Sequence, residues 1–487
     1  MVKFDKNNIW MILTLIILII GIVLRTCGLL QGHSFYLDEG DLIVNFRLFS
    51  YLGLFGPIYF DIQAPPMFLV MGKFLYSTFG YNEILLRSVI YFSGCLSLVL
   101  FFTLCKKVFK SNFSVFYAML FLSLSYNLIY YSQAFKQYTI EMMFAIIATI
   151  LFLNLDIEKL NRKDSLRLGI ISAVSFWFSY SLAFVLSGFA CVYLAKAIFE
   201  KSIYKIKNFL TYLLPIGIAF WIYYITNLQF VVGNKNLYTF WDRFTGFFPT
   251  SLAPINYIWG SNKYVVISVC ILLIIGVVRF YLEDKFKLAV IASPILMTLV
   301  ASALHLYPFG TRLIIFLFPF FFILIAKPFD HISIKNKTYS IFVLILFLMS
   351  MKYFQYKEYA HIAFNKNSYK QSTAREFINN LKKSDIKNNE YLYVGVDANG
   401  SINSYDEKNE IIDKVFIKER IIYEPKFSLK TSLNRIPKDV IIYFYLSDYM
   451  WCSDYSSQIM PWIEENCTIL NRIDEEAGTF IKCKTHK

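Results

Sequence analysis

The sequence predicts an all-α domain that crosses a membrane many times, followed by a small α/β domain. Of its 487 residues 57% are hydrophobic, and the mean hydropathy is +0.49, which is more apolar surface than a soluble protein of this size exposes. Apolar runs of roughly 20 residues, the length that spans a bilayer, recur along residues 1–352. Residues 353–487 are polar and carry equal numbers of acidic and basic side chains, so the formal net charge of +14 lies in residues 1–352.

The apolar runs predict about eleven spanning helices, each of roughly the length that a bilayer requires. The fifth and sixth share one apolar stretch that is too long for a single crossing, and we place the break between them near Ser179–Ser181. The predicted spans lie near 10–30, 83–105, 113–131, 138–155, 168–180, 182–198, 208–229, 264–282, 288–304, 313–326 and 338–352.

The loops between these runs predict the orientation of the chain. Lys and Arg concentrate in alternate loops, and an excess of Lys and Arg marks the cytoplasmic side. We therefore expect a cytoplasmic N-terminus and, because the number of spans is odd, an extracytoplasmic C-terminal domain. The basic residues follow the loops of a membrane protein and do not form a nucleic-acid-binding surface, so we expect no nucleic-acid partner. The predicted inside segments are 1–9, 106–112, 156–167, 196–207, 279–287 and 327–338.

Loop 31–82 is the long extracytoplasmic loop of the predicted membrane domain. It contains two apolar, aromatic segments, 41–55 and 66–79, which are too short to span a bilayer well. We expect both to be helices lying in the membrane interface, with Pro65–Pro66 starting the second.

The C-terminal residues 353–487 predict a small α/β domain. "STAREFINNLKK" and "SSQIMPWIEEN" have the pattern of helices, with Pro461 in the second. "YLYVGVD", "DVIIYFYLS" and "GTFIKCK" have the pattern of strands. We predict the division of the chain into 1–352 and 353–487 on this basis.

Three carboxylates, Asp38, Glu39 and Asp41, follow the first span within four residues. One interpretation is that such an acidic cluster merely keeps the loop solvated. Here it adjoins a membrane helix and precedes two segments that could roof a cavity. Partial desolvation at such a site favours the neutral acid and makes a carboxylate a usable proton acceptor. We therefore name Asp38 and Glu39 as candidate catalytic residues.

Ionisable side chains near other predicted helix ends are candidates for substrate binding. Lys136, Tyr138 and Glu141 lie at the outer end of the fourth span, where ionisable groups are rare and usually functional, although a Lys can also extend to the interface. "HLYPFGTR" contributes His305 and Arg312; an Arg there can bind a phosphate with paired hydrogen bonds or serve as an interfacial anchor.

Arg87, near the outer end of the second span, has the same two interpretations as Arg312. His33 and His305 are not spaced as metal ligands, so we assign no metal-binding residue.

The ordered set of these motifs resembles the C-type (GT-C) membrane glycosyltransferases, and among them the protein O-mannosyltransferase and aminoarabinose-transferase group. That group carries an Asp-Glu pair after the first helix, matched by "YLDEGD", and a Pro-Pro segment opening a helix, matched by "DIQAPPMFLVMGKFLYSTFG". "NEILLRSVIYFSG", "YYSQAFKQYTIEMMFA" and "TRLIIFLFPFFFILIA" match later motifs. The resemblance covers residues 1 to about 326. Ala134 departs from it, since relatives often have an acid there.

The resemblance implies an inverting glycosyltransferase whose donor is a sugar on a polyprenyl phosphate. Asp38 would take the proton of the acceptor with Glu39 assisting, and Lys136 and Arg312, with Arg87 as a weaker candidate, would stabilise the leaving phosphate. The acceptor would be a lipid, a glycan or a protein at the outer face of a prokaryotic plasma membrane. The resemblance implies no certain cofactor, and a divalent metal stays an open alternative.

Two other functions fit the same residues. A transporter or flippase of lipid-linked sugars would use these groups for binding alone, although the charges gather at the outer face and not at the midplane, where transporter sites usually lie. A polymerase or ligase of surface polysaccharide would use a similar donor on another fold.

Overall fold

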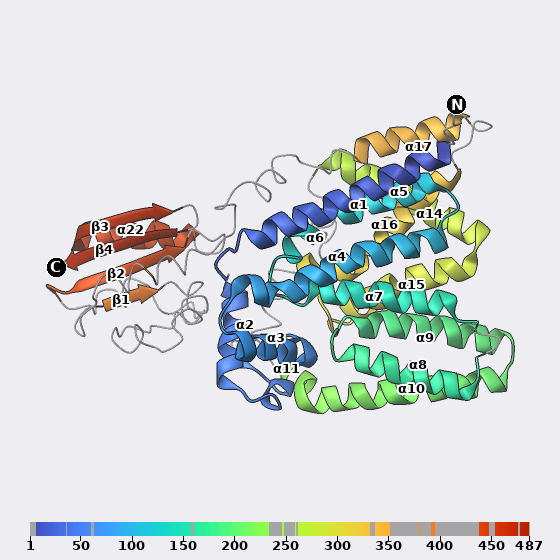
Figure 1. The fold of residues 1–487 in the computed structure, drawn as a ribbon, viewed down its shortest axis with the longest axis horizontal. Coiled ribbons are helices and arrows are strands. Elements are labelled where there is room, and N and C mark those ends of the chain that lie inside the picture. The colour runs from blue at the N-terminus through green and yellow to red at the C-terminus, as the bar shows by residue number, and fades with distance from the viewer. Residues whose placement is uncertain are drawn as a thin grey trace.

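The computed structural model describes residues 6–35, 37–59, 63–156, 160–232, 246–247, 259, 262–331, 337–350, 379, 391–394, 438–447, 453–475 and 478–486. Helices occupy most of the described residues up to 350, and a small sheet lies near the C-terminus (Figure 1). The predicted fold class, a helical membrane domain followed by a small α/β unit, is therefore confirmed.

The helical part begins with a long helix, α1, and two short ones, α2 and α3, that precede the long helix α4. Because Pro65 and Pro66 fix the backbone at the start of α3, this helix begins at Pro66, as predicted. The elements of this part are α1 (Lys6–Leu30), α2 (Leu37–Leu48), the 3₁₀ turn η1 (Gly53–Phe55), α3 (Pro66–Phe79) and α4 (Glu83–Val108).

The next helices complete one side of the bundle. The predicted break in the long apolar stretch is confirmed, because α8 ends at Phe176 and α9 begins at Leu182. The predicted span 113–131 is divided at Ser125, which ends α5 in an extended conformation. The elements are α5 (Asn112–Leu124), α6 (Tyr126–Tyr131), α7 (Tyr138–Asn154), α8 (Arg162–Phe176), α9 (Leu182–Phe199), α10 (Ile203–Tyr223), the π-helical turn η3 (Tyr224–Leu228) and α11 (Gln229–Val232).

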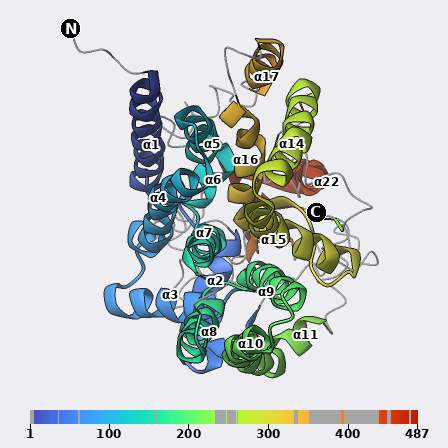
Figure 2. The ribbon, with the colours of Figure 1, turned by 90° about the vertical axis from the view of Figure 1, so that its right-hand side faces the viewer.

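The remaining helices close the bundle around an apolar core that includes the almost fully buried α16. Figure 2 shows α14, α15 and α16 on one side, with α1 and α4 on the other. The elements are α14 (Lys263–Glu283), α15 (Lys285–Ala303), the 3₁₀ segment η4 (Thr311–Leu317), α16 (Phe318–Ala326), η5 (Lys327–His331) and α17 (Lys337–Ser350).

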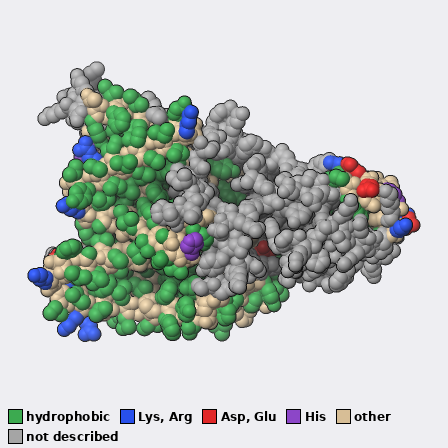
Figure 3. Space-filling model, turned by 180° about the vertical axis from the view of Figure 1, so that it is seen from behind, with side chains coloured by type: hydrophobic (Ala, Val, Ile, Leu, Met, Phe, Trp, Pro, Cys, Tyr) green, Lys and Arg blue, Asp and Glu red, His purple; other side chains and the backbone are tan. Residues whose placement is uncertain are grey.

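Every one of the eleven predicted spans contains helix, but the number of crossings is not confirmed. Among the described residues, seven helical segments are long and apolar enough to cross a membrane, and α5 and α7 are shorter apolar helices. Many large apolar side chains on these helices are exposed, as expected for a surface that faces lipid. Figure 3 shows hydrophobic side chains, in green, over much of one face of the bundle. Several Lys and Arg side chains, in blue, lie at the end of the bundle away from the C-terminal sheet.

The C-terminal part is a four-stranded sheet in the order β1-β2-β4-β3 with one helix against it. β1 pairs with β2 in parallel, and β4 pairs antiparallel with both β2 and β3. Three strands and α22 lie where the sequence predicts them, whereas β3 was not predicted; the helix predicted at "STAREFINNLKK" lies outside the described residues. The elements are β1 (Tyr391–Val394), β2 (Ile441–Ser447), α22 (Ser453–Asn466), β3 (Cys467–Glu475) and β4 (Gly478–Thr485).

Candidate active site

The acidic motif forms the first turn of α2. After α1 ends, the chain turns at Gly32, whose φ of 59° is readily adopted only by glycine, and α2 begins at Leu37. Asp38 and Glu39 therefore lie at a helix N-terminus, where the free backbone N–H groups and the helix dipole favour negative charge. The sequence placed them in a loop before a helix at 41–55; the helix starts four residues earlier.

Glu39 is buried in a paired contact with Arg87 of α4. Arg87 Nε donates to Glu39 Oε1 at 2.9 Å, and Nη2 donates to Oε2 at 2.7 Å. The backbone N–H of Phe135 also donates to Glu39 Oε1. Arg87 further donates to the backbone oxygens of His33, at 2.6 Å, and Ser34, at 3.2 Å. The pair thus joins α2, α4 and the segment before α7.

Arg87 and Glu39 form this contact away from solvent. The side chain of Arg87 is 7% exposed and that of Glu39 is 3% exposed, and the guanidinium is occupied by Glu39 and two backbone oxygens. Such a pair is geometrically favourable because two guanidinium N–H groups meet the two carboxylate oxygens and further N–H groups bind backbone oxygens. The structure therefore pairs Arg87 with Glu39, and this pair joins α2 to α4.

Asp38 is the meeting point of two cations from distant parts of the chain. Arg312 Nη2 lies 2.8 Å from Asp38 Oδ2, and Lys136 Nζ lies 3.8 Å from the same oxygen. Lys136 belongs to the segment between α6 and α7, and Arg312 is in the first turn of η4. The structure thus brings together three residues that the sequence predicted to share a site.

The charges around Asp38 change its protonation from the expected one. Burial alone would raise the pKa of Asp38, but the Arg312 guanidinium and the Lys136 ammonium outweigh it and hold the pKa below its usual range. Burial lowers the pKa of Lys136, and the charge of Asp38 opposes that shift. Asp38 is consequently an ionised counterion here, whereas the sequence predicted a carboxylate shifted toward its neutral form.

Asp41 is the carboxyl group of this region with the raised pKa. It lies one turn after Asp38 on α2 and is 8% exposed. Burial, reinforced by the charge of Asp38 and opposed by Lys136, raises the pKa of Asp41 to about 8. Asp41 is therefore mostly protonated at neutral pH. The acidic cluster of the sequence contains it, but the sequence offered no signal to separate it from its neighbours.

Tyr138 and Glu141 lie on the first turn of α7, which follows Lys136. Tyr138 is buried against the ring of Tyr131, with ring centroids 5.1 Å apart, and lies within electrostatic reach of Asp38 and Arg312. Glu141 is buried and accepts hydrogen bonds from Ser181 and from the backbone at Tyr180 and Ser181, at the start of α9. The structure therefore brings Tyr138 to the Asp38 cluster and directs Glu141 to α9.

His305 lies in the loop after α15 with a positive φ of 56°. Its side chain is exposed, and its ring packs on Phe247 with centroids 4.7 Å apart. Within the described part of the chain, no group of three or more His, Cys, Asp and Glu side chains is placed to hold a metal ion.

Comparison with solved structures shows the fold. ArnT from Cupriavidus metallidurans bound to undecaprenyl phosphate matches with a TM-score of 0.54 at 11% identity, covering 98% of each chain. The apo state of the same protein matches with a TM-score of 0.53 at 10% identity, again over 98% of both chains. This chain has the fold of ArnT. The resemblance that the sequence motifs indicated is confirmed at the level of fold.

The ArnT-like match extends over the whole chain, so it includes the C-terminal part as well as the membrane helices. No protein-family model matches the chain, and neither does any curated protein. At 10–11% identity the likeness is one of architecture.

Proposed function

We propose that this protein is an inverting glycosyltransferase that moves a sugar from a polyprenyl-phosphate donor to an acceptor at the outer face of a prokaryotic plasma membrane. The observation that carries the proposal is the convergence of Arg312 and Lys136 on Asp38 at the N-terminus of α2. Two cations supply what a leaving phosphate needs, and the carboxylate supplies a proton acceptor.

The charge of the cluster matches a donor phosphodiester. With Asp38 ionised and Asp41 protonated, Lys136 and Arg312 leave one positive charge in excess. A polyprenyl phosphodiester carries one negative charge at neutral pH. When it binds, its phosphate competes with Asp38 for the two cations. Asp38 then loses the charges that lower its pKa and becomes a stronger base once the donor is in place.

The reaction proceeds by displacement at the anomeric carbon. The acceptor oxygen forms a bond to this carbon while the bond from the carbon to the phosphate oxygen breaks, and its electron pair stays on the phosphate. Asp38 takes the proton of the acceptor hydroxyl. The product is a polyprenyl monophosphate whose additional negative charge is stabilised by Arg312 and Lys136. Attack opposite to the leaving group inverts the configuration.

The remaining site residues position these three groups. The Glu39–Arg87 pair fixes the first turn of α2 against α4, and Gln137 Nε2 donates to the backbone oxygen of Gln63 at 3.3 Å. That contact joins the Lys136 segment to the loop before α3. Tyr138 lies beside the cluster and would contact the donor.

The ArnT structure with undecaprenyl phosphate supports a polyprenyl phosphate as the lipid partner. The distribution of Lys and Arg in the loops supports a cytoplasmic N-terminus, an outward-facing Asp38 site and an extracytoplasmic domain at 353–487. We keep lipid, glycan and protein as the acceptor classes, because the described side chains recognise the phosphate and not the acceptor.

Sugar transfer by purified protein in nanodiscs tests the proposal, with a pool of polyprenyl-phosphate sugars as donors and release of polyprenyl phosphate as the readout. Asp38→Asn should lower the release rate by about 10²- to 10⁴-fold, the usual contribution of a general base. The control is Asp164→Asn, at an exposed carboxylate that pairs with Arg167 at the other end of the bundle.

Undiminished release by Asp38→Asn would contradict the assignment. If the wild-type protein moves labelled lipid-linked sugar across vesicles and never releases polyprenyl phosphate, the protein is a transporter.

A further inference from the structure

An apolar slot lies between α7 and α8. The two helices follow one another in the chain, but α7 packs mainly on α4 and η4, whereas α8 packs mainly on α10. The slot between them holds about 730 Å³ of space, counting the part open to the surroundings. Phe152, Phe189 and Phe209 form its buried floor, and Leu151 and Ile171 form exposed rims. Figures 1 and 2 show α9 and α10 beside the two helices.

The slot has a closed end and an end that lies away from the Asp38 cluster. Near the start of α7, Phe144 stacks on Phe178 with ring centroids 5.6 Å apart. At the other end the lining reaches Leu155 and Leu160, where Asn208 Nδ2 donates to the backbone oxygen of Leu160 at 2.7 Å. From Phe144 to Leu155 the helical rise is about 16 Å, roughly half of a ~30 Å hydrocarbon core. The slot is as long as one leaflet.

Basic side chains surround the end of the slot that lies away from the Asp38 cluster. α8 starts there with Arg162 and Lys163, both exposed, and Arg167 follows one turn later. Lys201 and Lys207 are exposed at the adjoining ends of α9 and α10. A basic group next to a membrane surface attracts anionic lipid headgroups, by about fivefold in affinity for each Lys or Arg.

We propose that the slot between α7 and α8 binds one acyl chain of an anionic phospholipid, with its headgroup phosphate against Arg162 and Lys163. The chain lies along the Phe152–Phe189–Phe209 floor and covers apolar side chains that the neighbouring helices leave uncovered. Four hydroxyl-bearing side chains line the slot, and each has a hydrogen-bond partner, so an apolar chain leaves none unpaired. Ser172 and Tyr212 hydrogen-bond to each other at 3.4 Å, and Ser175 and Tyr193 donate to the backbone oxygens of Ile171 and Lys205. This site is independent of the proposed sugar transfer.

Length and charge favour this occupant over a polyprenyl donor. The donor phosphate belongs at Asp38, and the stacked rings of Phe144 and Phe178 lie between that end of the bundle and the slot. An isoprenoid chain is much longer than one leaflet, whereas a phospholipid acyl chain matches the slot. The basic residues at the mouth complement a phospholipid phosphate at the opposite membrane surface.

Lipid retention in native mass spectrometry tests the proposal, with protein taken from nanodiscs that contain phosphatidylglycerol, phosphatidylethanolamine and polyprenyl phosphate. Wild-type protein should retain phosphatidylglycerol in preference to phosphatidylethanolamine. Ala148→Phe fills part of the slot and should lower retention by about tenfold, as expected when about two methylenes of the chain lose their buried site. Arg162→Gln/Lys163→Gln removes two basic groups and should lower it by about 30-fold, while Lys106→Gln/Arg279→Gln, on α4 and α14, serves as the matched control.

A photoreactive phosphatidylglycerol with a diazirine in its acyl chain keeps the test independent of whether the variants fold. In wild-type protein it should label peptides of α7 and α8 that contain slot residues. Labelling confined to other helices, equal retention in Ala148→Phe and wild type, or retention of polyprenyl phosphate in the slot would each overturn the proposal.

Discussion

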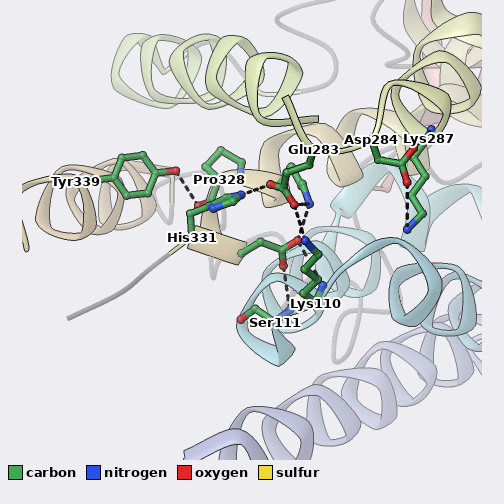
Figure 4. Close-up of polar contacts among 10 residues, drawn as sticks. Lys110, Ser111, Glu283, Asp284, Lys287, Pro328, His331 and Tyr339 are labelled. Carbon is green, nitrogen blue, oxygen red and sulfur yellow. Dashed lines mark hydrogen bonds and ion pairs between the residues drawn. The ribbon is translucent and has the colours of Figure 1, made fainter. Parts of the chain in front are cut away.

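Two clusters of charged side chains lie at opposite ends of the helical bundle and are built differently. At the α2 end, Arg312 and Lys136 share one oxygen of Asp38. At the other end, Glu283 of α14 binds Lys110 at 3.0 Å and Lys327 at 3.2 Å through Oε2, and His331 through Oε1. Figure 4 shows this second cluster, in which side chains from three segments meet at Glu283.

The second cluster contains two carboxylates, Glu283 and Asp330, which together bind its basic side chains. Lys327 Nζ lies 2.8 Å from Asp330 Oδ2. The Asp330 carboxylate also accepts hydrogen bonds from the backbone N–H groups of Lys110 and Ser111. Both oxygens of Glu283 are occupied, and the contacts join the ends of α4, α14 and α16. Such a network fixes helix ends in place. The Asp38 cluster, by contrast, has more positive than negative charge and holds its cations on one oxygen, so an anion can enter it.

Arg87→Met should have the largest effect on stability. It leaves Glu39 buried without its partner, and loss of one member of a buried pair costs about 3–5 kcal/mol. Thermal unfolding in detergent, followed by intrinsic fluorescence, measures the loss. Arg167→Met, in an exposed pair with Asp164, is the control and should cost about 1 kcal/mol or less. An equal loss in both variants would mean that the Glu39–Arg87 pair does not hold α2.

Arg312→Gln should leave stability nearly unchanged and weaken phosphate binding. Arg312 is 31% exposed and makes a charged contact that a donor phosphate would take over. Loss of a hydrogen bond to a charged group costs about 1.5–3 kcal/mol, so KM for the donor should rise about 10- to 100-fold. Steady-state transfer kinetics measure it, with Lys110→Gln of the Glu283 cluster as the control. A donor KM equal to that of the wild-type protein would show that Arg312 does not bind the donor phosphate.

Glu283→Gln should cost stability and leave transfer intact. Its cations are exposed or have a second partner in Asp330, so the expected loss is about 1 kcal/mol. Unfolding and donor KM are measured on the same preparation. A large rise in donor KM without a loss of stability would show that the two clusters do not differ as described.

The smallest expected effect is that of Asp41→Asn on the pH dependence of donor binding. Since the pKa of Asp41 is about 8, the wild-type group is neutral below that pH and becomes charged above it. The new negative charge repels the donor phosphate, so donor affinity in wild type should fall by a fewfold between about pH 7 and pH 9. Asp41→Asn stays neutral and should show a flat profile, measured with KM at each pH. The same decline in the variant would exclude Asp41 as its cause.

Much of the fold could be predicted from the sequence because hydrophobic length and proline position are local signals. The apolar runs located the helices, and Pro65–Pro66 located the start of α3. The number of crossings could not be read in this way, since α8 and α17 are shorter than a full span and the sequence does not show how they lie. β3 was missed because "CTILNRIDE" alternates poorly and carries charges.

The site was predicted in part. Its residues were found because charges beside membrane helices are rare, and Asp38, Lys136 and Arg312 do converge. What the sequence could not provide was the pairing: nothing local shows that Arg87 faces Glu39 and that Arg312 faces Asp38. That choice depends on how α2 is rotated against α4 and η4, and it reverses the expected pKa shift of Asp38.

The affinity of wild-type protein and Asp38→Asn for polyprenyl phosphate, measured by microscale thermophoresis in nanodiscs, tests the central claim most directly. If Asp38 and the phosphate compete for Arg312 and Lys136, removing the carboxylate charge should tighten binding about tenfold, equivalent to 1.4 kcal/mol, while sugar transfer is lost. Unchanged or weaker binding by Asp38→Asn would contradict the account.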